Sequence, residues 1–337
     1  GFLCGTGQLA ASYCPIIGID PSDLNTPNIA IGELAGEQTV TRTVTNVGPA
    51  GMYTVSVDAP GGIDVVVSPD ALELEEGESA SYTVTFTATD DAQLNAYAFG
   101  NLTWSLGSYN VRSALVVRPV QLAAPDTVGG AGATGSASFD VSFGYSGAYT
   151  AGTHGLEPAA LTAGNVVDDP ANDINTALAT GVGVTFHFVN VPAGTALARF
   201  SLFDAYTDGN DDLDLYVFGP TGFVGGSGSA TSAEEVNAVL PVGGVYTVVV
   251  HGWQTDGPDA NYTLFNWNVS ATPGTGTYPL SLDAAPAAAV LGSTGSVEIS
   301  WDVSGDTATV GRKYLGAVSH SDGGGLIGLT VVEVEDE

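Results

Sequence analysis

Apolar and polar residues alternate in short runs along most of the chain. Residues 39–45, TVTRTVT, alternate strictly and are followed by a turn, Asn-Val-Gly, at 46–48. This period of two places every second side chain on one face, as in a strand buried on one side. Further runs of this kind lie at 53–57, 63–67, 81–86 and 115–117. Their spacing is typical of a β-sandwich.

The same pattern continues to the C-terminus. Between 136 and 272 the expected strands are 138–143, 184–189, 197–203, 214–218, 246–250 and 262–267. Beyond about 275 they are 296–301, 314–318 and 329–334. The chain ends in VEVEDE, 332–337, which we expect to be an edge strand whose charges discourage pairing with another chain. The pattern therefore predicts an all-β protein.

Composition agrees with this prediction and bounds the domain number. The chain has 337 residues, of which 44% are hydrophobic and 46 are glycine. That is enough for two or three domains with their own cores, with glycine serving the turns. There is no apolar run long enough to span a bilayer, so we expect no membrane insertion.

The charge is strongly acidic, with 37 Asp and Glu against 6 Lys and Arg, a net charge of −31. Nucleic acids and anionic membranes should repel such a chain. The two cysteines, Cys4 and Cys14, lie close together. They predict a disulfide and an oxidising, extracellular compartment, with two buried free thiols as the alternative. The start, Gly-Phe-Leu-Cys, lacks an initiator methionine and a signal sequence, which indicates a processed or truncated piece.

Several motifs in the first segment resemble one family in sequence order. They are FLC at 2–4, DLN at 23–25, TRTVTNVG at 41–48, FGNLTW at 99–104 and VRS at 111–113. Residues 1–119 thus resemble the fibronectin-III-like domain that follows the catalytic domain of subtilisin-like serine proteases. The resemblance implies a β-sandwich that packs on the protease and influences its stability and substrate access.

The second segment, 120–272, resembles a different module of secreted proteases. The motifs are DDPANDINTA at 168–177, NDDLDLYVFGPTG at 210–222 and PVGGVYTVVVHGW at 241–253. They are similar to the bacterial pre-peptidase C-terminal domain, a jelly-roll-like β-sandwich. The remaining 273–337 fit a small Ig- or fibronectin-like domain. The expected architecture is therefore three β-sandwich modules in series.

The chain lacks the sequence signs of a catalytic site. A subtilisin-like protease carries its serine in a Gly-Thr-Ser-Met-Ala-type motif, which is absent, and the one methionine is Met52. None of the four histidines, His154, His187, His251 and His320, stands in the His-Gly-Thr setting of that family. A G-x-G-x-x-G at 130–135 has no strand-to-helix context and predicts no dinucleotide site. We therefore expect no enzymatic activity from this chain.

Calcium is the candidate cofactor. Asp208, Asn210, Asp212 and Asp214 fall at every second position, as in a loop that wraps oxygens around a hard cation. A strand that starts in solvent gives the same spacing. The resemblance supplies a second acidic segment with Asp169, Asn172 and Asp173, which in related domains can meet the first and hold calcium between them. A purely solvated acidic turn stays open as the alternative.

Two aromatic contexts complete the candidates. Trp253, in a turn after His251, is the best surface platform for a polymeric ligand, whereas Trp104 and Trp301 lie in alternating strands and are expected in the core. His187 should point away from the face that carries Phe186 and Phe188.

Together these features predict a non-catalytic accessory region of a secreted bacterial subtilisin-like protease. Its partners would be the parent protease domain and an extracellular polymer or surface. The alternative is a processed, self-associating structural protein, a homo-polymer in which unpaired strands add to a neighbour's sheet.

Overall fold

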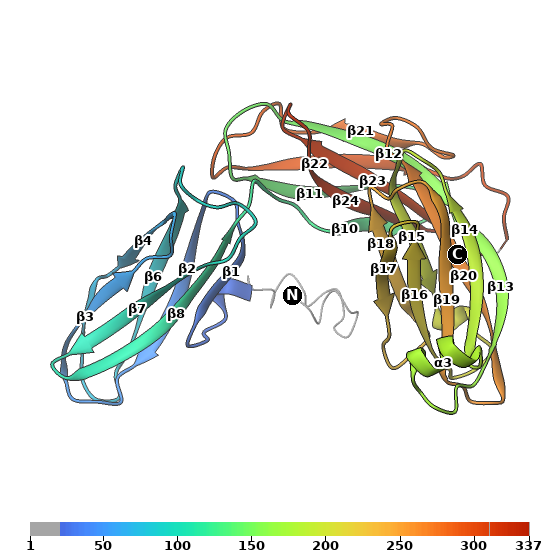
Figure 1. The fold of residues 1–337 in the computed structure, drawn as a ribbon. Coiled ribbons are helices and arrows are strands. Elements are labelled where there is room, and N and C mark those ends of the chain that lie inside the picture. The colour runs from blue at the N-terminus through green and yellow to red at the C-terminus, as the bar shows by residue number, and fades with distance from the viewer. Residues whose placement is uncertain (1–20, 310, 337) are drawn as a thin grey trace. The chain divides into compact units, whose positions relative to one another are not determined.

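The computed structural model describes residues 21–309 and 311–336, whose regular secondary structure is almost entirely β-strand (Figure 1). Contacts divide them into two compact units. The first holds the described residues up to 124 with 140–149 and 287–295, and the second holds 125–139, 150–286 and 296 onward. No helix in this described part is long and apolar enough to cross a membrane. The expected all-β fold is confirmed.

The first unit contains a sandwich of a five-stranded and a three-stranded sheet. The five-stranded sheet has the order β1 (Ile29–Leu34), β8 (Tyr109–Pro119), β7 (Ala98–Leu106), β3 (Gly51–Asp58) and β5 (Ala71–Leu74). The three-stranded sheet has the order β2 (Glu37–Thr45), β6 (Ser79–Ala88) and β4 (Ile63–Ser68). A short 3-10 helix, η1 (Pro21–Asp23), precedes them.

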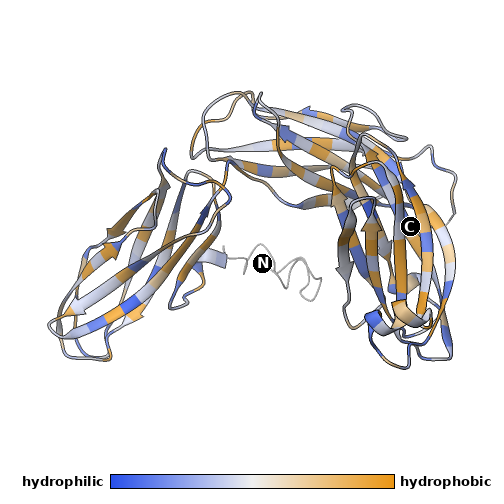
Figure 2. Cartoon of the chain, viewed as in Figure 1, coloured by the Kyte–Doolittle hydropathy of each residue, from blue (hydrophilic) through white to orange (hydrophobic). Residues whose placement is uncertain are grey.

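Alternation along the strands builds this core (Figure 2). On β2, Val40 is buried, while Thr39 and Thr43 lie on the opposite, exposed face and hydrogen-bond across to β6. Trp104 is 5% exposed and meets the edge of Tyr82, with ring centroids 5.1 Å apart. The core position expected for Trp104 is therefore confirmed, and Trp301, also 5% exposed, agrees.

The outer edge of β2 is covered by side chains from the preceding loop. Asp23 Oδ1 accepts the N–H of Thr41 at 2.8 Å, and Asn25 Oδ1 accepts the N–H of Thr43 at 2.9 Å. Asn25 also donates to the carbonyl of Thr43 at 3.0 Å. These contacts satisfy backbone groups that an added strand would need. The DLN motif at 23–25 thus closes this edge.

Four four-stranded sheets make up the rest of the described chain. The first has the order β10 (Thr127–Ala131), β24 (Leu326–Glu335), β23 (Lys313–Ser321) and β12 (Thr150–Pro158). The second has the order β21 (Leu280–Ala284), β22 (Thr294–Asp302), β11 (Thr134–Phe143) and β9 (Leu122–Ala123). The third has the order β13 (Ala160–Val167), β20 (Asp259–Ser270), β15 (Thr195–Leu202) and β18 (Glu234–Val239). The fourth has the order β14 (Val184–Val191), β19 (Gly244–Gln254), β16 (Asp212–Gly219) and β17 (Gly222–Ser227).

Strand pairing crosses the boundary expected between 272 and 273. Strand β12 pairs with β23 and β10 pairs with β24, so strands from before residue 160 share a sheet with strands from after 310. The strands from β13 to β20 pair among themselves. Residues 160–270 therefore form an insertion within a sandwich whose strands come from both sides of it.

A buried cluster within the second unit joins the insertion to its host sheet. Trp267 Nε1 donates to the carbonyl of Lys313 at 3.1 Å. The cluster combines strands β15 and β20 of the insertion with β23 and β24, and consists of Leu197, Phe265, Trp267, Val269, Leu315, Ala317 and Val331. The cluster therefore joins strands that lie about fifty residues apart in the sequence or more, β15 and β20 with β23 and β24.

Strand β24 lies inside its sheet, between β10 and β23, so the edge position expected for 332–337 is wrong. Its acidic side chains are neutralised by cations: Arg199 pairs with Glu333, Lys313 with Glu335 at 2.6 Å, and Arg312 with Asp336 at 2.5 Å. The side chains of Glu333 and Glu335 remain 43% and 58% exposed, so water and these cations together solvate their charges.

The glycine-rich segment at 130–135 packs on Trp301. Side-chain Cβ atoms at Gly130 and Gly135 would lie 2.6 Å and 2.4 Å from the indole ring, and Trp301 Nε1 donates to the carbonyl of Gly132 at 3.2 Å. The segment joins strands β10 and β11, in keeping with the rejection of a dinucleotide site.

Candidate functional site

A buried histidine flanked by two carboxylates lies on the outward side of the β14-β19-β16-β17 sheet. Along β19, Tyr246, Val248 and Val250 belong to the core of the insertion. His251 follows in the alternation and points away from this core, opposite Asp214 of β16. His251 is nevertheless 0% exposed and Asp214 5% exposed. Another part of the chain must therefore cover them.

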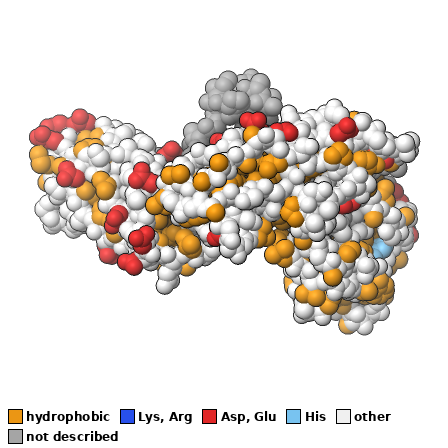
Figure 3. Space-filling model, turned by 90° about the horizontal axis from the view of Figure 1, so that it is seen from above, with side chains coloured by type: hydrophobic (Ala, Val, Ile, Leu, Met, Phe, Trp, Pro, Cys, Tyr) orange, Lys and Arg blue, Asp and Glu red, His pale blue; other side chains and the backbone are white. Residues whose placement is uncertain are grey.

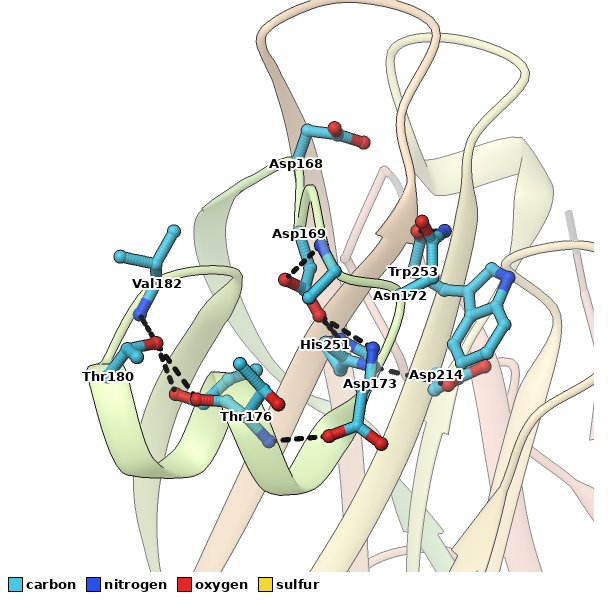
Figure 4. A network of polar contacts seen from close by, with 12 residues as sticks. Asp168, Asp169, Asn172, Asp173, Thr176, Thr180, Val182, Asp214, His251 and Trp253 are labelled. Atoms are coloured by element: carbon cyan, nitrogen blue, oxygen red, sulfur yellow. Dashed lines mark hydrogen bonds and ion pairs between the residues drawn. The ribbon is translucent and has the colours of Figure 1, made fainter.

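That cover is the segment from Asp168 to the short helix α3 (Ile174–Thr180) (Figure 4). The Asp169 N–H donates to the carbonyl of Gly252 at 2.9 Å, which fixes the segment on β19. Asp169 accepts the N–H groups of Ala171 at 3.0 Å and Asp173 at 2.9 Å. Asp173 in turn caps α3 by accepting the N–H of Thr176 at 2.7 Å.

The imidazole of His251 joins the cover to the sheet. Its Nε2 lies 3.0 Å from Asp169 Oδ2, and its Nδ1 lies 3.3 Å from Asp214 Oδ2. A carboxylate accepts hydrogen bonds, so contact at both nitrogens favours the doubly protonated imidazolium. Burial lowers the pKa of His251, but the hydrogen bonds to Asp214 and Asp169 outweigh it and raise the pKa above its ordinary value.

The pKa of Asp169 changes in the matching direction. Burial raises the pKa of Asp169, but the hydrogen bonds from His251 and two backbone N–H groups outweigh it, and the pKa is lowered. Tyr216 donates to Asp214 Oδ2 at 3.1 Å, and its pKa is raised to about 12 by burial and then by the Asp214 charge. The set is therefore a bridge of two carboxylates around one cation.

Two further acidic side chains, Glu234 and Asp212, lie beside this bridge. Glu234, 2% exposed, accepts hydrogen bonds from the Ser227 hydroxyl and from the Ser229 N–H at 2.6 Å. Burial and then the charges of Asp214 and Glu234 raise the pKa of Asp212, whose buried Oδ1 has no hydrogen-bond partner.

The structure brings together only part of the expected calcium set. Asp169, Asp173 and Asp214 lie around His251. Asn172 donates to the carbonyl of Trp253, Asp208 accepts the N–H of Asn261 at 2.8 Å, and the Asn210 N–H donates to Asp256 at 3.0 Å. In the part of the chain that the structure describes, no three His, Cys, Asp or Glu side chains are grouped to hold a metal.

His251 occupies the position between the two acidic segments where the cation was expected. Calcium takes six to eight oxygens, whereas Asp169 already accepts hydrogen bonds on both of its oxygens. The carboxylate oxygens therefore fit the imidazolium of His251 better than a calcium ion. Calcium binding stays a prediction. The apolar alternation of β19 was the signal that could have placed His251 beside Asp214 in advance.

The remaining histidines are each held by a neutral partner. His154 Nδ1 lies 2.8 Å from the carbonyl of Ser270, and His187 Nε2 lies 2.8 Å from the Tyr262 hydroxyl. His320 Nε2 lies 3.0 Å from Thr330 Oγ1. His187 points away from the exposed rings of Phe186 and Phe188, as expected.

Two expected features stay untested. Cys4 and Cys14 lie outside the described residues, so their disulfide stays a prediction. Trp253 is 37% exposed, and its ring stands at 89° to that of His251 with centroids 5.9 Å apart. Its ligand role also stays a prediction.

Comparisons with known proteins find a matching family model and relatives for the first part of the chain. Residues 23–117 match the family model described as a fibronectin type-III domain. The chain is similar to the CO(2)-response secreted protease of Arabidopsis thaliana, with 46% identity over 101 residues, 28% of this chain and 13% of that protein. It is also similar to Subtilisin-like protease SBT3.16 of the same plant, with 43% identity over 129 residues, 35% of this chain and 17% of the relative.

A third relative, Subtilisin-like protease SBT5.1 of A. thaliana, is 44% identical over 107 residues, 29% of this chain and 14% of its own length. The chain thus spans less than a fifth of these relatives. Among solved structures, the chaperone–tip adhesion subunit complex of Acinetobacter baumannii Csu pili covers 28% of this chain and 55% of its own, with 17% identity and a TM-score of 0.22, too low to support an argument. The fibronectin-III-like region therefore corresponds to a non-catalytic part of subtilisin-like proteases.

Proposed function

We propose that this chain is the non-catalytic accessory region of a secreted bacterial subtilisin-like protease, and that it works outside the cell. The observation that carries the proposal is the fibronectin type-III match at 23–117 together with the similarity to subtilisin-like proteases over the same part of the chain. Its role is to stabilise or position the protease and to bind extracellular substrate or surface. The pre-peptidase C-terminal-like character of 120–272 belongs to this proposal.

Two features support an accessory module over a self-assembling fibre. Asp23 and Asn25 satisfy backbone groups on the edge of β2, which removes one site for strand addition. A net charge of −31 opposes close contact between copies of the chain.

The test is deletion of this region from the intact parent protease. We expect the truncated enzyme to keep its rate on a short soluble peptide, to hydrolyse an insoluble protein more slowly, and to inactivate at a lower temperature. The isolated chain should hydrolyse neither substrate. Proteolysis by the isolated chain, or identical behaviour of truncated and intact enzyme, would contradict the proposal.

A further inference from the structure

A hollow of about 440 Å³ opens on the surface of the first sandwich. Its wall comes from the turn between β3 and β4 and from the segment that leads from β6 into β7. The lining includes Gly61, Gly62, Asp91, Gln93, Tyr97 and Phe99. A hollow of this size can take a small molecule or one side chain of another protein.

Backbone contacts hold the two segments of this wall together. The Thr89 N–H donates to the carbonyl of Gly62 at 2.9 Å, and the Ala92 N–H donates to the carbonyl of Thr89 at 3.0 Å. Gly62 has a φ of +75°, and a Cβ there would lie 2.6 Å from Ala92 Cα. Only glycine permits this backbone angle and this close approach together. The shape of the hollow is therefore set by the backbone.

Two exposed aromatic rings line the hollow. Phe99 is 70% exposed and Tyr97 56% exposed. Leu102 and Trp104 of β7 belong to the core, so Phe99 lies on the opposite, outward face of this strand. Arg118 Cζ lies 5.9 Å from the centroid of the Tyr97 ring. The protein itself thus places a cation over one of these rings, an arrangement that the charge distribution of an aromatic ring favours.

The charge of Arg118 is already paired, whereas the polar side chains of the hollow are free. Arg118 contacts Glu33 at 3.1 Å and donates to the carbonyl of Gly32 at 2.6 Å. Asp91 and Gln93 are exposed, and within the described part of the chain no hydrogen bond or ion pair engages their side chains. Asp91 is the one charged residue of the lining. The hollow therefore offers an unpaired carboxylate beside two rings.

Three separate attractions favour the same kind of ligand. A carboxylate forms charge-assisted hydrogen bonds with an ammonium or guanidinium group. The faces of the Tyr97 and Phe99 rings attract the same cations. A net charge of −31 raises the concentration of cations near the whole protein, and acidic side chains form several groups on the surface (Figure 3). A basic group satisfies the carboxylate and the rings together.

We propose that this hollow binds the basic side chain, lysine or arginine, of a polypeptide segment. The charged end would pair with Asp91 and Gln93, and the apolar stem would lie against Phe99. The inference rests on the proposed accessory function, since it names the kind of substrate segment that the region would hold for the protease.

The experiment is an NMR titration of the intact 337-residue chain, labelled with ¹⁵N and ²H. The probes are blocked tripeptides, acetyl-Gly-X-Gly-amide, in which X is lysine, arginine or glutamine. A single charge on each basic probe limits its general attraction to an acidic protein. We expect the lysine and arginine probes to shift the amide signals of residues 61–62 and 91–99, the glutamine probe to leave them in place, and 0.5 M salt to weaken binding.

Two variants separate local binding from long-range attraction. Phe99→Thr removes a ring from β7 without changing the charge, and its control is Tyr109→Thr, which removes a 56% exposed ring of β8 outside the hollow. Asp91→Asn removes the carboxylate, and its control is Glu76→Gln, which makes the same change of charge in another exposed loop. We expect each test variant to bind the lysine probe about fivefold more weakly and each control to bind it as the wild type does. Circular dichroism and Tm establish that each variant is folded.

Three results would overturn the inference. Absence of shifts at 61–62 and 91–99, or equal affinity of Phe99→Thr and Tyr109→Thr, removes the site. Shifts spread over acidic residues throughout the chain would show general attraction of cations only. An equal response to the glutamine probe, or shifts of the same signals by cellobiose, would assign the hollow to a neutral ligand. The protease deletion described above measures hydrolysis and heat inactivation, so its outcome is independent of this titration.

Discussion

His251 Nε2 lies 3.0 Å from Asp169 Oδ2, although the two residues belong to different elements, a strand and the segment that covers it. The imidazole also meets Asp214 at 3.3 Å, so one proton-dependent cation holds two carboxylates that would otherwise repel each other. This contact adds to the hydrogen bonds from Asp169 to the Gly252 carbonyl and from Asn172 to the Trp253 carbonyl, which also attach the covering segment to the sheet.

We expect His251→Asn to lower the free energy of unfolding by about 3 kcal/mol near pH 6, because it leaves two buried carboxylates without their cation. The pKa of His251 is raised above the usual 6.5, so its stabilisation is fully present below pH 6.5 and is lost as the pH rises through the folded pKa. The pKa of Asp169 is lowered below 3.8, so its part is present above pH 3.8 and is lost as the pH falls through its folded pKa.

Urea unfolding from pH 4.5 to 9.5 checks this expectation. The stability difference between wild type and His251→Asn should be largest in the acidic half of that range and should shrink towards pH 9.5. The control is His187→Asn, which changes a histidine whose pKa burial lowers. A difference that grows with pH would rule out the charged bridge.

His320 should show the opposite dependence. It is fully buried beside Thr330, and burial lowers its pKa to about 4. Below about pH 6.5 His320 is protonated in the unfolded chain but stays neutral in the folded chain. The free energy of unfolding therefore falls between pH 6.5 and pH 4, by about 3 kcal/mol for a pKa shift of this size. In His320→Asn the overall stability should drop, but this part of the pH slope should disappear. Parallel curves for the two proteins in denaturant titrations would contradict the assignment.

Gly135 is expected to tolerate no side chain. A Cβ there would lie 2.4 Å from the Trp301 ring, so Gly135→Ala should cost about 1–3 kcal/mol through overpacking. Gly32→Ala on β1 is the control, because no atom lies within 4 Å of its Cβ position. Calorimetry should give a lower Tm for Gly135→Ala and little change for Gly32→Ala. Equal Tm values would mean that Trp301 can move aside.

Arg199 and Glu333 should be energetically coupled, because they join strand β15 of the insertion to strand β24 of its host sheet. The Arg199 side chain is 6% exposed and also contacts Glu235 at 2.9 Å. A double-mutant cycle with Arg199→Met and Glu333→Gln should give a coupling energy of about 1–2 kcal/mol. The exposed pair Arg118 and Glu33 provides the comparison and should give less than about 1 kcal/mol. A coupling no larger than that of the surface pair would assign the attachment to the apolar cluster around Trp267.

The sequence predicted local structure better than the pairing of distant strands. The alternation at 39–45 and 184–189 correctly indicated strands, and it placed His187 opposite Phe186 and Phe188. Nothing local in 332–337 distinguishes an edge strand from an interior one. Its position follows from pairing with β10 and β23, and β10 lies far away in the sequence.

At the candidate site, too, the sequence predicted part of the arrangement but not the contact between distant residues. The two acidic segments were expected to meet, and Asp169 and Asp214 do lie around one group. Spacing alone could not say which cation joins them, because carboxylates both accept hydrogen bonds from an imidazolium and ligate metal ions. His251 stands in the PVGGVYTVVVHGW motif, and its role in charge balance depends on Asp169, which is distant in the sequence.

Chelation is the sharpest test of that difference. With His251 between the carboxylates, we expect the Tm of the wild type to change by less than about 2 °C between millimolar calcium and excess chelator, and light scattering to give one monomer mass in both. In His251→Asn, Asp169 and Asp214 lose their cation, so calcium should raise the Tm of this variant more than that of the wild type. Asp214→Asn in the same background is the control and should abolish the gain. A large chelator effect on wild type would restore calcium at this site, and assemblies that dissolve on chelation would favour a calcium-held polymer over an accessory module.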